Sequence, residues 1–96
     1  MIKHVEATTA ECTKAREIAH LVLNNRDKIQ DALWKRLDEA GLPDDLRRAL
    51  GWAVSHASDN LKVMFSGLDQ ETDQGAIDYT IREGTALLQA ARVRND

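Results

Sequence analysis

One segment of the chain, residues 43 to about 66, carries more apolar surface than a single-sided helix needs. With successive residues 100° apart, as in an ideal helix, eight apolar residues fall on one stripe. Val54 and Phe65 widen this stripe on one side, and Trp52 and Val63 widen it on the other. The apolar arc reaches roughly 220°, against roughly 100° for an ordinary surface helix. This helix must therefore be covered from two sides, by its own chain or by another molecule. The stripe consists of Leu46, Ala49, Leu50, Ala53, Ala57, Leu61, Met64 and Leu68.

The rest of the chain is also typical of helices. It contains 96 residues with one proline, two tryptophans, one tyrosine and one phenylalanine, a composition that favours helix over strand. We expect an all-α fold with a single domain over residues 1–96, in which residues 1–7 form a loose N-terminal arm. Three main helices are predicted, at 9–40, 43–66 and 73–93. Because their connections are short, they should form an antiparallel bundle.

Local signals set several of the helix boundaries. Thr8 and Glu11 have the spacing of a capping box, which begins the first helix. Gly41 suits the left-handed position after a helix end, and Pro43 suits the first position of the next helix. Within 9–40 the apolar period is kept across Asn24, so a continuous helix is favoured over one that is kinked there. Gly84 lies on the apolar face of the last helix, which predicts the close approach of a neighbouring backbone.

Charge and cysteine content narrow the class of protein. The net charge is −3, both signs are interspersed, and no basic patch suited to phosphates is visible. The single cysteine, Cys12, suits a reducing compartment. Met1–Glu6 has no apolar stretch like that of a signal peptide, and no apolar run approaches the length of a transmembrane helix. We therefore expect a cytoplasmic protein that does not interact with membranes.

The sequence offers little for catalysis. His56 and Asp59 lie three residues apart on one helical face, but a closed zinc site needs four ligands and no others are evident. Cys12 has no histidine partner in the sequence and is expected to be a small apolar core residue. We find no glycine-rich phosphate loop. The expectation is a protein that is not an enzyme and binds no cofactor or metal.

Residues 46–62 bear a superficial likeness to a helix-turn-helix, the alternative hypothesis for function. In that arrangement Ala49-Leu50-Gly51 ends one helix and a second helix enters the major groove. The turn would have to contain Trp52-Ala53-Val54, which are not turn formers. The proposed recognition helix has only Lys62 as a cation, so phosphate binding would be poor. We therefore do not expect this segment to bind nucleic acid.

The two tryptophans give the leading hypothesis. Trp34 and Trp52 both lie to one side of their helices' apolar stripes, where they either cover the edge of the core or anchor an interface. The broad apolar arc of 43–66 favours an interface. We therefore expect a small regulator that binds another protein, as an inhibitor, an anti-activator or an adaptor that sequesters a transcription factor. A homodimer formed through helix 43–66 would cover the remaining apolar surface. The predicted partner-binding residues are Trp52, Val54, Val63 and Phe65, with Leu23 and Trp34 as a secondary patch.

Overall fold

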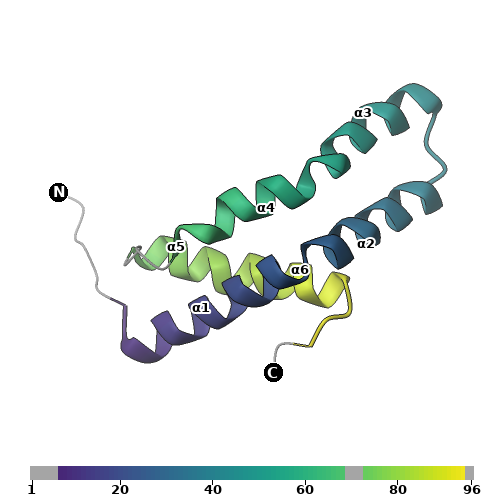
Figure 1. Ribbon diagram of the computed structural model, residues 1–96. Helices are drawn as coiled ribbons and strands as arrows, with labels where there is room; N and C mark the ends of the chain where they lie inside the picture. Colours follow the sequence, from purple (N-terminus) through teal and green to yellow (C-terminus); the bar gives the residue numbers. More distant parts are fainter. Residues whose placement is uncertain (1–6, 69–72, 95–96) are drawn as a thin grey trace.

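The computed structural model describes residues 7–68 and 73–94, and within these ranges the fold is all-helical (Figure 1). The predicted N-terminal arm therefore lies, except for Ala7, outside the described residues. In the described part of the chain, no helix has the length and apolar character needed to cross a lipid bilayer. The helical elements are α1 (Thr9–Asn24), α2 (Arg26–Glu39), α3 (Asp44–Ser55), α4 (Ala57–Ser66), α5 (Gln74–Tyr79), the π-helix η2 (Thr80–Gly84) and α6 (Thr85–Ala90).

The first predicted helix, 9–40, is divided in two by Asn25. The capping box is present as expected, since Glu11 N donates to Thr8 Oγ1 and Thr8 N donates to Glu11 Oε1. Asn25 leaves the helical conformation with φ −118° and ψ 21°, and its Nδ2 donates to Leu21 O at 2.8 Å. Such side-chain bonds compete with the helical backbone. The kinked alternative is therefore correct, and the preference for one continuous helix was wrong.

The second predicted helix, 43–66, is divided at His56, which has φ −97° and ψ 3°. Pro43 lies at the N-cap rather than at the first helical position, and Gly41 adopts the expected left-handed φ of +62°. The break at His56 frees the amide of Ser58, which donates to Gln30 Oε1 of α2 at 3.2 Å. A side chain of the neighbouring helix thus satisfies a backbone group that the break leaves unpaired.

The third predicted helix, 73–93, is observed from Gln74 to Ala90. Asp73 caps it by accepting from Gly75 N at 2.6 Å. Its middle turn is the π-helix η2, which ends at Gly84. A β-carbon at Gly84 would collide with Cγ2 of Ile18 on α1. A close approach at this glycine is therefore present, but the prediction of a neighbouring backbone was wrong, because the group that approaches is the Ile18 side chain.

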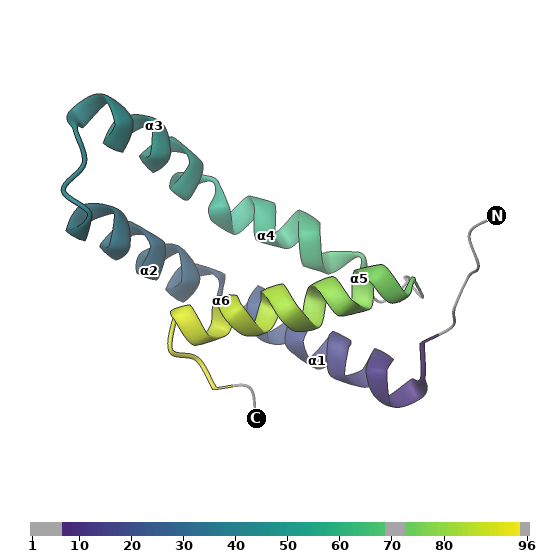
Figure 2. The ribbon, with the colours of Figure 1, turned by 180° about the vertical axis from the view of Figure 1, so that it is seen from behind.

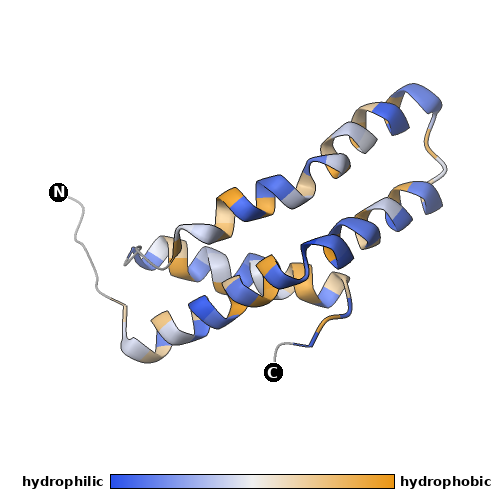
Figure 3. Ribbon diagram, viewed as in Figure 1, coloured by the Kyte–Doolittle hydropathy of each residue, from blue (hydrophilic) through white to orange (hydrophobic). Residues whose placement is uncertain are grey.

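The core lies where α1, α4 and the α5–η2–α6 segment meet. Figures 1 and 2 show that the chain reverses between α2 and α3. The last segment packs across α1, and the Tyr79 ring of α5 packs near the Phe65 ring of α4. In Figure 3 much of the orange, apolar ribbon lies around this junction, and blue predominates on α2. The buried core residues are Ala15, Ile18, Ala19, Val22, Ile29, Leu61, Phe65, Leu68, Ile77 and Leu88.

The helical hairpin is longer than the segment that covers it. From Thr9 to Glu39 the chain spans about 46 Å, whereas Gln74 to Ala90 spans about 25 Å, at about 1.5 Å per residue. Both views show α3 and the end of α2 extending beyond α6 (Figures 1 and 2). We call α3, the part of α2 that faces it and their connecting turn the two-helix end. There, α3 packs mainly on α2, and within residues 7–68 and 73–94 no third helix covers it.

Candidate interaction surface

The large apolar side chains exposed in the described residues all lie on α3 and α4. Val63 is 79% exposed and Trp52 69% exposed, the highest values of the set. Packed helices normally turn such side chains inward, so their exposure along these two helices makes this region the candidate interaction surface. The full set is Leu46, Leu50, Trp52, Val63 and Met64.

The exposure on α3 follows from the two-helix end. Gly51 is the only buried residue of α3, and it lies against Trp34 and Leu37 of α2. Leu46 and Leu50 lie about 100–140° around the helix from Gly51 at 100° per residue, so they point away from α2. A third helix would have to cover them, and α6 ends before it reaches this level (Figure 2).

This result corrects the predicted stripe from Leu46 to Leu68. In its second half Leu61 and Leu68 are core as expected, each 6% exposed, whereas Met64 is 48% exposed. Its first half is not core, because Leu46 and Leu50 are 47% and 42% exposed. The stripe is continuous along the sequence, but other helices pack on only part of it.

Of the predicted partner-binding residues, Trp52 and Val63 lie together on one exposed side of the helix pair. They are eleven residues apart, three helical turns, and His56 and Asp59 lie between them on the same side. All four residues are exposed. The rings of Trp52 and His56 are in contact, with centroids 4.4 Å apart and a tilt of 51°. We call Trp52, His56, Asp59 and Val63 the flank.

The opposite predicted pair faces inward. Phe65 is 1% exposed and belongs to the core, where its ring lies 6.2 Å from that of Tyr79. Val54 is half-buried on the same side. Phe65 is therefore not accessible to a partner of this chain and leaves the candidate surface. Its burial has a simple cause, since this side of the helix pair faces α1 and α2.

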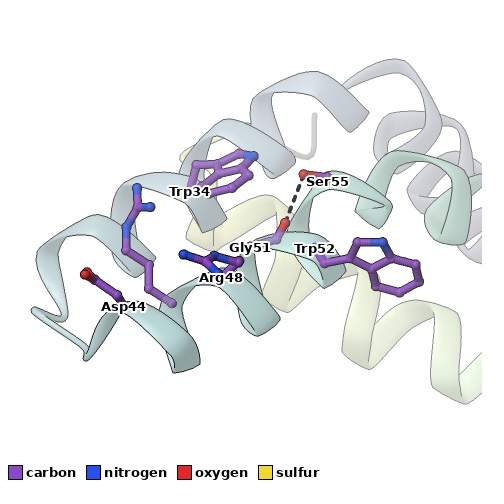
Figure 4. Close-up of a pocket in the computed structure, with 7 residues that line it drawn as sticks. Trp34, Asp44, Arg48, Gly51, Trp52 and Ser55 are labelled. Atoms are coloured by element: carbon purple, nitrogen blue, oxygen red, sulfur yellow. Dashed lines mark hydrogen bonds between the residues drawn. The ribbon is translucent and has the colours of Figure 1, made fainter.

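The secondary patch is separated by the fold. Leu23 is half-buried and packs against the core cluster, whereas Trp34 is half-buried against Gly51 at the two-helix end. Trp52 points away from Trp34 (Figure 4). The two tryptophans therefore do not form one surface, and the structure gives Trp34 a packing role between α2 and α3.

A hollow of about 410 Å³ lies beside Trp34 and Gly51 (Figure 4). Arg47, on its rim, donates to Asp38 Oδ1 at 2.5 Å, and Ser55 Oγ donates to Gly51 O at 2.9 Å. Small-molecule sites enclose most of their ligand, whereas most side chains around this hollow are exposed. We assign it no ligand. The lining residues are Trp34, Asp44, Arg47, Arg48, Gly51, Trp52 and Ser55.

Sequence reasoning missed Leu46, Leu50 and Met64 as surface residues, because periodicity identifies an apolar face and not what covers it. The signal that was available was length. The predicted helix 73–93 is shorter than 9–40, so it cannot cover the whole hairpin. The predicted boundaries already implied a two-helix end.

The helix-turn-helix alternative lacks its usual geometry. Helix α3 continues through Gly51 to Ser55, so no turn is present at residues 52–54. Helix α4 then runs on in nearly the direction of α3 (Figures 1 and 2), whereas the two helices of the motif cross at about 90–120°.

The described residues contain no group of three or more His, Cys, Asp or Glu side chains placed to hold a metal ion. The pKa of the Glu11 carboxyl group is lowered by hydrogen bonds from the backbone and side chain of Thr8 and from Gln74. This carboxylate belongs to the cap of α1 and lies away from the flank. No family model, no curated protein and no solved structure matches this chain.

Proposed function

We propose that the protein is a small, non-enzymatic cytoplasmic regulator that binds another protein through the flank. The observation that supports this most directly is the exposure of Trp52 and Val63, at 69% and 79%, on one side of a helix pair. A tryptophan in the centre of a contact commonly supplies a large share of the binding energy. The regulatory role itself, as an inhibitor, anti-activator or adaptor, is part of the proposal.

The flank also defines the kind of partner that fits it. Trp52 and Val63 offer apolar contact at two points three turns apart, matching the anchors of an amphipathic helix. Asp59 lies between them and is exposed, and the flank itself has no lysine or arginine. The complementary surface is therefore a helix with aliphatic anchors and a basic residue beside them.

The test uses a photo-crosslinking amino acid in place of Val63, introduced in cells that make the protein naturally. We expect a covalent adduct with a different protein, which is then identified by mass and purified. Trp52→Ala should weaken binding of that purified partner by about 30-fold or more, as expected for a hot-spot residue. The same crosslinker at Lys14, exposed on α1, serves as the control and should give no such adduct. If position 63 gives no adduct with another protein, the proposal is rejected.

A further inference from the structure

A second strip of residues runs along α3 and α4 beside the flank. Its members are spaced by four, three, four, three and four residues, which is the spacing of a coiled-coil seam. None is charged, and each is at least partly exposed. We call this strip the seam. It consists of Leu46, Leu50, Ala53, Ala57, Asn60 and Met64.

The spacing of the seam reads the same in both directions. If two copies are laid side by side and antiparallel about a two-fold axis near Ser55, Leu46 of each meets Met64 of the other. By the same operation Leu50 meets Asn60, and Ala53 meets Ala57. We infer that the seam binds the same seam of a second copy in this antiparallel arrangement. A two-fold contact requires self-complementarity of this kind, because one patch must fit itself.

The sizes of the seam residues fit this pairing. Ala53 and Ala57 lie at the centre, where small side chains let two helices approach closely. The longer Leu46 and Met64 lie at the ends. Beside Met64, a hollow of about 260 Å³ opens between α4 and α5, with Leu68, Ala76 and Tyr79 among its walls. Leu46 of the second copy is placed to enter this hollow.

Charge favours the antiparallel orientation over the parallel one. In a parallel pair the positive N-terminal ends of the two α3 helices would lie side by side, which is unfavourable. The antiparallel pair separates the two ends by about 27 Å, the length of 18 residues of helix. It also places the two helix dipoles in opposite directions.

The area of the seam sets the strength of the dimer. A strip about 27 Å long and about 11 Å wide buries about 300 Å² on each copy, from the helix rise and diameter. A standard interface buries about 800 Å² on each partner. We therefore expect a dimer that forms in the micromolar range and dissociates on dilution. Because Trp52 lies about 120° from the centre of the seam, it stays exposed in the dimer, whereas Val63 also borders the hollow beside Met64. The dimer inference is argued from the seam alone and does not rest on the proposed function.

Sedimentation equilibrium of the full chain from about 5 µM to about 1 mM tests the dimer. The weight-average mass should rise from 10.7 kDa toward twice that value. Leu50→Asp places a charge in the seam and should hold the mass at the monomer value, with an unchanged helical circular dichroism spectrum. Trp52→Asp adds the same charge on the flank, away from the hollow beside Met64, and should dimerise normally. A monomeric wild type at the highest concentration, or equal dimerisation of both variants and the wild type, overturns the inference.

Crosslinking tests the orientation. In a Cys12→Ser background, chains with Leu46→Cys are mixed with differently tagged chains carrying Met64→Cys and treated with a short bismaleimide. The antiparallel pair gives the mixed product, whereas each variant alone gives none, because equivalent residues are about 27 Å apart along the axis. A crosslink that joins position 46 of one copy to position 46 of the other overturns the antiparallel arrangement. If the mixed product is absent while a crosslinker at Val63 still reaches another protein, the dimer is rejected and the proposed function stands.

Discussion

The indole ring of Trp34 lies so close to Gly51 that a β-carbon on the glycine would be 2.9 Å from Cη2 of the ring. This contact joins α2 to α3 at the two-helix end, where a third helix gives no cover. Gly51 is also the one buried residue of α3. The packing of α3 on α2 therefore depends on a glycine that leaves room for a tryptophan.

Gly51→Val should displace Trp34 and destabilise the fold by about 1–3 kcal/mol, the usual cost of overpacking. Urea unfolding measures the loss. The fluorescence of Trp34, recorded in a Trp52→Phe background, should shift to the red as the ring becomes solvated. Gly67→Val is the control, since no atom lies within 4 Å of a β-carbon there. An unchanged spectrum and midpoint for Gly51→Val would contradict the packing role of Trp34.

For Gly84→Ala, two effects on the free energy of unfolding have opposite signs. Helix propensity alone would predict a gain of about 1 kcal/mol, but the new methyl group would collide with Ile18, which is fully buried. We expect a net loss of stability, because the cost of overpacking, about 1–3 kcal/mol, exceeds the gain. Gly67→Ala, where the space is open, should be neutral or slightly stabilising. A stabilised Gly84→Ala variant would show that α1 and η2 are less tightly packed than described.

Phe65 and Val63 are two residues apart and face opposite environments. Phe65→Ala should lower the free energy of unfolding by about 3–5 kcal/mol, because it leaves a cavity in the core. Val63→Ala should change it by less than about 0.5 kcal/mol, as is usual for surface positions. Denaturant unfolding of both variants checks this difference. Similar losses for the two would mean that Val63 is covered in solution by part of the same chain.

Arg92 is the non-glycine residue with a positive φ among those described, at +56°. It follows α6, where Val93 N donates to Leu88 O at 2.8 Å, as in a Schellman motif. Arg92→Gly removes the left-handed penalty of about 1–2 kcal/mol but adds unfolded-state entropy worth about 0.5–1 kcal/mol. A net gain of about 0.5 kcal/mol is expected in thermal or urea unfolding. Arg94→Gly, as the control, should bring no gain.

We expect the α1 cap to contribute to the free energy of unfolding in a pH-dependent way through Glu11. Hydrogen bonds from Thr8 and Gln74 lower the pKa of its carboxyl group. A carboxyl whose pKa is lower in the folded state stabilises the fold above its unfolded pKa of about 4.3, and this contribution is lost as pH falls through the folded value. Glu11→Gln keeps the cap spacing but removes the charge. Its urea midpoint should lie below that of the wild type at pH 7 and converge with it once the pH falls below the folded pKa of Glu11; a constant difference would contradict this assignment.

The features that were predictable from the sequence depend only on residues a few positions apart in the chain. The Thr8–Glu11 capping box and the left-handed Gly41 were both expected and are both present, because each is decided within a few positions. The break at His56 had no such signal, since the apolar period continues through it. Its stabilisation by Gln30 involves a residue 28 positions away, beyond the reach of any local pattern.

The candidate surface shows the same limit. The sequence placed Trp52 and Val63 together on one flank of the apolar stripe, but it could not decide which flank faced the core. That decision depends on how α3 and α4 are rotated against α1 and α2. Burial of Phe65 and exposure of Leu46 are two results of this one rotation and of the short final segment.

The two-helix end also has a consequence for local unfolding. Amide protons are protected in proportion to the free energy of opening their segment, and segments with few buried side chains open first. The amides of α3 should therefore exchange with deuterated solvent faster than those of α1 and α4 around the core. When the exposed face of α3 becomes covered, those same amides should slow, so that α3 reports on occupancy without any label.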